Sequence, residues 1–104
     1  MTEIKQILGG SITTPQGFSA GSIHAGLKTQ GNAPLDLGII YSHFPATVAG
    51  TFTTNKVRSP SVALSEDNVS SGKAQAIIAN SGCANCCVGQ QGLKDALEIS
   101  QLTA

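Results

Sequence analysis

The chain of 104 residues lacks the large aromatic side chains that usually dominate a hydrophobic core. It has no Trp, one Tyr and three Phe. Burial must therefore come mostly from Ala, Val, Ile and Leu, at roughly 25 cal/mol per Å² of apolar surface. The 12 glycines raise the entropy of the unfolded chain, which opposes folding. We expect a domain of this size and composition to be only marginally stable alone and to pack against partner surface.

Clusters of like charge and long apolar runs are also missing. Six basic and six acidic residues give no net charge, and the lysines are scattered along the chain. This distribution disfavours binding of nucleic acid or an anionic membrane through a basic face. No apolar run approaches the roughly 20 residues that a membrane helix needs. The N-terminus also lacks the pattern of a secretory signal, so we predict a cytoplasmic protein.

Cysteine is present only as a small group, Cys83, Cys86 and Cys87. An odd, clustered set is a poor disulfide framework, so reduced thiols are expected. The Cys-x-x-Cys-Cys spacing is also compatible with a redox pair or a zinc site. Structural zinc needs four ligands, however, and nothing in the spacing indicates a fourth from His24 or His43. We therefore expect the cysteines to be buried small apolar side chains, and we predict no metal and no cofactor.

Residue patterning predicts several strands followed by one long helix, an α+β fold that is mostly β. Alternation slips at Gly21 in the first strand, which suggests a bulge or bend there. Glycine at position 50 suggests close approach by neighbouring backbone. The strand candidates are residues 18–27, 35–41, 47–54, 61–64 and 74–79, of which the last is expected to be fully buried.

Turns and helices are indicated between and after these strands. Residues 29–34 predict a hairpin or loop, and Ser70-Ser71-Gly72 predicts a turn. Ser65 is a candidate cap for a brief helical turn through Asn68. From about Gly89 onward, apolar residues follow helical spacing.

The segment Asn80-Ser81-Gly82-Cys83-Ala84-Asn85 lies between the expected buried strand and the final helix. Small polar residues at such a position allow backbone and side-chain amides to converge, as in many ligand-binding or catalytic loops. The simpler alternative is a strand-to-helix turn whose Asn side chains satisfy local backbone groups. The sequence leaves open whether this loop touches a substrate.

Several segments occur together in a characteristic order. They are Ile12–Phe18, Ala25–Lys28, Asp36–Ile40, Pro45–Val57 and Ala74–Gly92. In order and spacing they resemble the bifunctional ornithine acetyltransferase / glutamate N-acetyltransferase family of arginine biosynthesis. The most specific element is Phe52-Thr53-Thr54-Asn55 followed at this distance by Asn80-Ser81-Gly82.

The resemblance implies an enzyme that moves an acetyl group from N-acetylornithine to glutamate. In that family a precursor cleaves itself before a threonine in an Ala-Thr-Met-Leu motif, and the new N-terminal threonine is the nucleophile. A separate Thr-Gly pair stabilises the oxyanion. Here Ala46-Thr47 is followed by Val48-Ala49, and no Thr-Gly pair occurs.

Residues 1–104 are therefore expected to form a single region, the N-terminal part of the α subunit, and to be incomplete and inactive alone. The implied partners are small-molecule substrates, the remaining α-subunit sequence and the β subunit. The sequence departs from the family pattern at three places, because Cys83 replaces a usual Asn, Cys86-Cys87 replace small residues, and His43 replaces a more often acidic residue.

Other chemically capable residues have simpler interpretations. His24 and His43 are candidate general bases, but ordinary surface or half-buried histidines are the expected alternative. Three threonines are candidate nucleophiles, but β-branched residues that alternate along a strand are more often part of the sheet surface. Lys56 and Arg58 are candidates for holding a carboxylate, against a solvated basic pair. The threonines concerned are Thr51, Thr53 and Thr54.

We therefore predict no catalytic residue within the chain, and no substrate-binding residue is assigned. Two alternatives to the enzyme portion remain open, a catalytically inactive truncated scaffold and a small metal-binding module built on the cysteine cluster.

Overall fold

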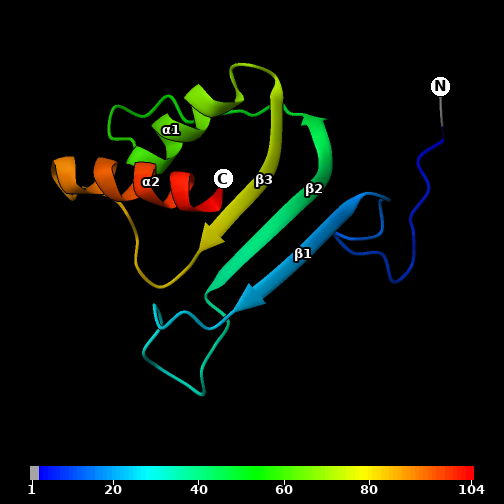
Figure 1. The fold of residues 1–104 in the computed structure, drawn as a ribbon, viewed down its shortest axis with the longest axis horizontal. Helices are drawn as coiled ribbons and strands as arrows, with labels where there is room; N and C mark the ends of the chain where they lie inside the picture. The colour runs from blue at the N-terminus through cyan, green and yellow to red at the C-terminus, as the bar shows by residue number, and fades with distance from the viewer. Residues whose placement is uncertain (1–2) are drawn as a thin grey trace.

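The computed structural model describes residues 3–104. It contains a three-stranded antiparallel sheet of order β1-β2-β3 and two helices (Figure 1). This agrees with the predicted α+β class, and the long helix follows the last strand as expected. In chain order the elements are β1 (Phe18–Ile23), β2 (Leu37–Thr47), α1 (Pro60–Val69), β3 (Lys73–Asn80) and α2 (Gly89–Thr103).

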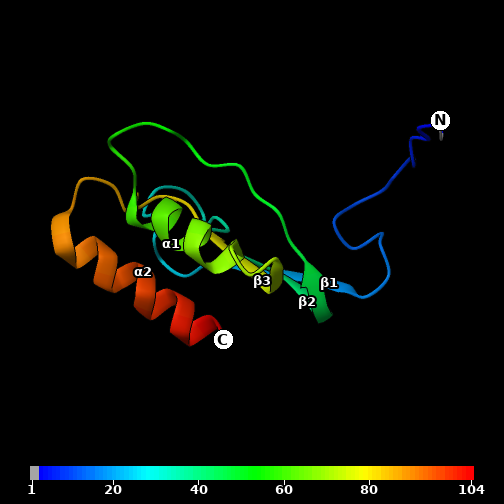
Figure 2. The same cartoon turned by 90° about the horizontal axis from the view of Figure 1, so that it is seen from above.

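The two edges of the sheet have different surroundings. Both helices lie on the β3 side, whereas β1 forms the opposite edge, next to the N-terminal segment (Figure 1). Seen from above, the N-terminal segment extends away from the sheet on the side opposite the helices (Figure 2). The radius of gyration is 16.0 Å, against about 13 Å for a compact domain of this length. The chain is therefore extended rather than closed around one core.

β2 is longer than the predicted strand 35–41 because a bulge carries it past Pro45. Its pairing with β3 is regular up to Tyr41 and resumes at Ala46 after a register shift. Proline cannot donate to a sheet and is tolerated at such bulges. Of the bulge or bend predicted at Gly21, the bulge is absent, because β1 pairs with β2 without a register shift. β1 also ends at Ile23, and residues 24–36 form the connection to β2.

α1 occupies a region where a short strand, 61–64, was predicted, so that prediction was wrong. Ser59 caps the helix by accepting a hydrogen bond from the Val62 N–H at 3.4 Å, and Pro60 takes the first helical turn. Ser followed by Pro is a typical helix start, since proline has no N–H to leave unpaired there. Ser65 lies inside this helix and is not its cap.

The predicted strand 47–54 was also wrong beyond Thr47. Residues 48–54 are irregular, and the Val48 N–H donates to the Gly72 carbonyl at 3.0 Å. A close approach at Gly50 does occur, but its partner is a side chain rather than backbone. A Cβ at Gly50 would lie 2.9 Å from the Phe52 ring. The predicted turn at 70–72 is present, with Gly72 at a φ of 75°.

Few side chains of the described residues are buried. Ala96 is the only buried hydrophobic side chain among them, and Ile77 in β3 remains 60% exposed. The accessible surface is 8329 Å², against about 5,400 Å² for a compact monomer of this mass. The prediction that β3 is fully buried was therefore wrong, because within residues 3–104 β3 is an edge strand with partial cover.

Neither α1 nor α2 has the length and apolar character needed to cross a membrane, and the described part of the chain holds no other helix.

Candidate functional site

The most completely buried polar group in residues 3–104 is the Asp36 side chain, at the entrance to β2. The residue is 3% exposed. Its Oδ1 accepts the Ala25 N–H at 2.6 Å, and its Oδ2 accepts those of Leu27 and Lys28 at 2.7 and 2.9 Å. These three donors belong to the turn that follows β1. The Asp36 carboxylate therefore fixes the conformation of the connection between β1 and β2.

The surroundings of Asp36 favour its ionised form. The backbone N–H groups of Ala25 and Lys28 are the main causes that lower the pKa of this carboxyl below its ordinary value of 3.8. Burial opposes this shift, whereas the Leu27 N–H and the nearby His24 add to it. Hydrogen bonds donated to a carboxylate stabilise its charge, so Asp36 is an anion at neutral pH.

Asp36 also connects this turn to the predicted loop after β3. The Ser81 N–H donates to the Asp36 backbone carbonyl at 2.9 Å. Gly82, at a φ of 103°, lies so close to the turn that a Cβ would stand 2.6 Å from Lys28 Cγ and 3.3 Å from the Leu27 carbonyl. Only glycine fits both the backbone angle and the space. We call this arrangement of residues 25–28, Asp36 and residues 80–82 the Asp36 junction.

His24 flanks the Asp36 junction and is largely held by backbone. Its Nδ1 lies 2.8 Å from the Pro34 carbonyl and 3.6 Å from Asp36 Oδ2. Because a carbonyl can only accept, the shorter contact requires a proton on Nδ1. The His24 side chain is 35% exposed, as the simpler interpretation of a surface or half-buried histidine predicted, and its bond to Pro34 gives it an orienting role in the loop.

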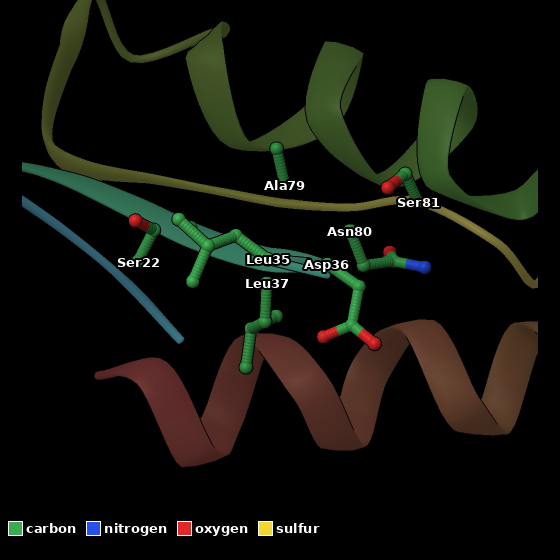
Figure 3. A pocket seen from close by; sticks show the side chains of 8 residues that line it. Ser22, Leu35, Asp36, Leu37, Ala79, Asn80 and Ser81 are labelled. Atoms are coloured by element: carbon green, nitrogen blue, oxygen red, sulfur yellow. The ribbon is translucent and has the colours of Figure 1, made fainter. Parts of the chain in front are cut away.

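An open hollow of about 290 Å³ adjoins the Asp36 junction. Figure 3 shows the Asp36 side chain pointing to one side of the strands and the Ser81 side chain to the opposite side. A second hollow, of about 390 Å³, lies over the sheet and shares Ser22, Gly38 and Ala79 with the first. Both lack a closing wall within the described residues. The first is lined by Ser22, Leu35, Asp36, Leu37, Gly38, Ala79, Asn80 and Ser81.

The other end of the predicted loop is fixed to α2. Asn85 Nδ2 donates to the Gly92 carbonyl at 2.7 Å, and Asn80 Nδ2 donates to the Cys83 carbonyl at 3.3 Å. A Cβ at Gly92 would stand 2.3 Å from Asn85 Oδ1 and 3.3 Å from Pro60 Cγ, so glycine allows α1, α2 and the loop to meet. The two asparagines thus satisfy local backbone, as the simpler interpretation of this loop predicted.

The three cysteines are exposed, so the prediction that they are buried was wrong. They lie in the loop between β3 and α2. The Sγ atoms of Cys86 and Cys87 are 3.6 Å apart. Hydrogen bonding to Cys87 raises the pKa of the Cys86 thiol, with the charge of Cys87 and burial acting in the same direction.

The remaining candidates do not gather at the Asp36 junction. His43 Nε2 lies 2.8 Å from Ser19 Oγ, near the opposite end of the β1–β2 pairing. Arg58 is half-buried and pairs with Glu66 at 2.5 Å, so the predicted solvated pair with Lys56 was wrong. The three candidate threonines are exposed on the irregular segment after β2; they are Thr51, Thr53 and Thr54.

Asp36 itself was missed as a site residue. The available signal was an acidic residue at the start of an otherwise apolar strand, in a chain with only six acidic residues. A charge in such a position requires compensation, because burial of an unpaired carboxylate is costly. The sequence does not show that the compensation comes from three backbone N–H groups of the preceding turn.

Comparison with known proteins gives consistent results. The model of the ArgJ family matches residues 19–104. An arginine biosynthesis bifunctional protein ArgJ from Dehalococcoides mccartyi is 50% identical over 95 residues, which are 91% of this chain and 24% of that protein. The protein of the same name from Staphylococcus epidermidis is 50% identical over 99 residues, with 94% and 24% covered. The chain thus spans about a quarter of the length of these relatives.

Two solved structures share the fold. The arginine biosynthesis bifunctional protein from Bacillus halodurans has a TM-score of 0.82 and 40% identity, over 89% of this chain and 48% of that one. Ornithine acetyltransferase from Mycobacterium tuberculosis, solved in complex with ornithine, has a TM-score of 0.76 and 31% identity, over 89% and 52%. From the family match over residues 19–104 and these relatives, the chain belongs to the ArgJ family.

Proposed function

We propose that residues 1–104 are the N-terminal part of the α subunit of an acetyltransferase that moves the acetyl group of N2-acetylornithine to glutamate in arginine biosynthesis. The observation that carries this proposal is the Asp36 junction. It brings together three family-like segments, Ala25–Lys28, Asp36–Ile40 and the start of the 80–85 loop. Residues 80–82 are distant in sequence from the other two segments, and their convergence with them next to a hollow is typical of a positioned substrate site.

In this proposal the chain supplies support, and the reacting groups come from elsewhere. The nucleophilic threonine, released by autocatalytic cleavage, and the oxyanion donors lie outside these residues. The partners are the remaining α-subunit sequence and the β subunit, and acetyl-CoA is a second donor if the protein is bifunctional like its relatives. A cytoplasmic location belongs to the same proposal, because it rests on the biosynthetic relatives.

The exposed surface supports the idea that the region is completed by other sequence. Ala20, Ile40 and Ile77 occupy one cross-strand row, and we call this row the open sheet face. Ile77 is 60% exposed and Ala20 is exposed, whereas Ile40 is half-buried. Apolar rows of this kind are normally covered in a finished domain, and the hollow over this row has no closing wall.

A chimera tests the proposal. Residues 1–104 would replace the matching segment of the Bacillus halodurans relative, and acetyl transfer from N2-acetylornithine to glutamate would be measured. We expect the chimera to transfer acetyl at a rate within about tenfold of the unmodified relative, and the chain alone to show none. The tenfold margin is about 1.4 kcal/mol in activation free energy, which allows for imperfect packing at the new boundary.

A folded chimera without acetyl transfer would instead favour the catalytically inactive scaffold. Transfer by the chain alone would contradict the proposal that the nucleophile lies elsewhere. A four-ligand zinc module has no support in the structure, because no three His, Cys, Asp or Glu side chains of residues 3–104 gather in a metal-binding arrangement.

A further inference from the structure

Cys86 and Cys87 form a pair of neighbouring thiols that the proposed acetyl transfer does not use. Both are exposed, and their Sγ atoms lie 3.6 Å apart. Side chains of adjacent residues in an extended strand point to opposite sides. Here Cys87 has a φ of 58°, in the left-handed region, and this backbone turn accompanies the approach of the two sulfurs.

The spacing of the two sulfurs discriminates between two kinds of thiol chemistry. A disulfide needs an S–S length of about 2.05 Å and Cα atoms at least about 4.4 Å apart. Neighbouring residues joined by a trans peptide hold their Cα atoms only about 3.8 Å apart, so a disulfide here would be strained. Two sulfurs bound at about 2.3 Å to one pyramidal centre, with an angle of roughly 95–100° between the two bonds, lie about 3.4–3.5 Å apart, which is close to the observed 3.6 Å.

We propose that Cys86 and Cys87 form a two-sulfur site for a thiophilic centre of the trivalent-arsenic class. With an organic arsenous acid the reaction is balanced as one R–As(OH)2 and two thiols giving R–As(S–Cys)2 and two waters. Two As–S bonds form, two As–O bonds break, and each thiol proton leaves in a water molecule. No electrons are transferred, so no oxidant is needed.

The surroundings of the pair favour two ligands over three or four. No third His, Cys, Asp or Glu joins the pair to make a metal-binding group among residues 3–104. The bound atom must therefore take its protein ligands from two sulfurs alone. A trivalent arsenic with one organic substituent does so, because it has two hydroxyl groups to exchange for thiols.

The test is titration of the reduced chain with phenylarsine oxide, followed by intact mass and free-thiol counting. We expect one arsenic per chain and the loss of two of the three thiols. Cys86→Ser and Cys87→Ser should each weaken binding by roughly 10²-fold or more, because the second bond is no longer intramolecular. Cys83→Ser is the matched control in the same loop and should bind like the unmodified chain.

Reversal by a dithiol provides a second measurement. 2,3-Dimercaptopropanol should remove the arsenic, whereas a single thiol such as 2-mercaptoethanol at the same concentration should not. The proposal would be overturned if no adduct forms, or if Cys83→Ser weakens binding as much as Cys86→Ser does. Undiminished binding by Cys86→Ser would overturn it as well. None of these results depends on acetyl transfer.

Discussion

The Asp36 junction, at one end of the sheet, and the open sheet face, on the strands themselves, differ in how completely they are formed. At the junction, the buried carboxylate of Asp36 accepts hydrogen bonds from three backbone N–H groups, and the backbone carbonyl of Asp36 accepts one from a fourth. On the open sheet face, Ile77 keeps 60% of its surface exposed. Polar groups of neighbouring turns can be paired within a short stretch of chain, whereas apolar burial requires a second layer of structure.

This difference indicates how the two regions should respond to mutation. Changes at the Asp36 junction remove interactions that already exist, so they should be damaging in every context. Changes on the open sheet face should matter only after other sequence covers it. Each substitution can therefore be compared in two proteins, the chain alone and the chimera with the Bacillus halodurans relative.

The largest effect is expected for Asp36→Asn. The amide keeps the size of the side chain, but it loses the charge and can accept fewer of the N–H groups of the preceding turn. The turn and residues 80–82 should then separate. In the chimera we expect acetyl transfer to fall by roughly 10²-fold, the cost of a displacement of about 1 Å near a site. Initial-rate measurements on the purified chimera would check this.

Acid titration is the control for that variant. The folded-state pKa of Asp36 is lowered, so its contribution to stability is present above the ordinary value of 3.8 and is lost as the pH falls through the folded-state pKa. Circular dichroism between pH 5 and pH 2 should show a weaker acid dependence for Asp36→Asn than for the parent. Equal acid dependence and unchanged acetyl transfer would mean that the carboxylate does not hold the junction together.

An intermediate effect is expected for Ile77→Ala, and it should depend on context. In the chain alone the side chain is exposed, so the free energy of unfolding should change by less than about 1 kcal/mol. In the chimera the same change should cost about 2–5 kcal/mol, as for a buried isoleucine. Urea denaturation of both proteins would measure the two values. Similar small values in both would show that the face remains uncovered in the larger protein.

An effect smaller than that of Ile77→Ala in the chimera is expected for Gly92→Ala, and it should be measurable in the chain alone. The new methyl group would overlap Asn85 Oδ1 and approach Val88 Cγ2 to 2.6 Å. Overpacking of this kind costs about 1–3 kcal/mol, and it should loosen the start of α2. Gly21→Ala is the control, because a Cβ there meets nothing within 4 Å. A loss of stability as large for Gly21→Ala would show that crowding at α2 is not the cause.

Patterning predicted the parts of the fold that are determined by local sequence. The apolar run 74–79 gave β3, the helical spacing after Gly89 gave α2, and Ser70-Ser71-Gly72 gave the turn. The strand predicted at 61–64 failed because Ser59 and Pro60 start a helix there, in which the Ser59 side chain accepts from the Val62 N–H. The strand predicted at 47–54 failed because β-branched residues favour a sheet only where a neighbouring strand is available.

The candidate site was predicted only in part. The 80–85 loop was located correctly by its small polar residues, and its asparagines bind local backbone as one alternative stated. The role of Asp36 depends on residues 25–28 folding back against the start of β2, where their N–H groups reach its carboxylate. The connection between β1 and β2 is irregular, so residue patterning does not predict this contact. The exposure of the cysteines depends on what covers the loop, which residues 3–104 do not supply.

Hydrogen–deuterium exchange on the chain alone and on the chimera would test the central claim most directly, namely that this region is the supporting part of a larger acetyltransferase. The amides of Ala25, Leu27 and Lys28 should be protected in both proteins, because Asp36 accepts all three. The amides of β3 should gain at least about tenfold protection in the chimera, once the open sheet face is covered. Equal protection of β3 in both proteins would contradict the account.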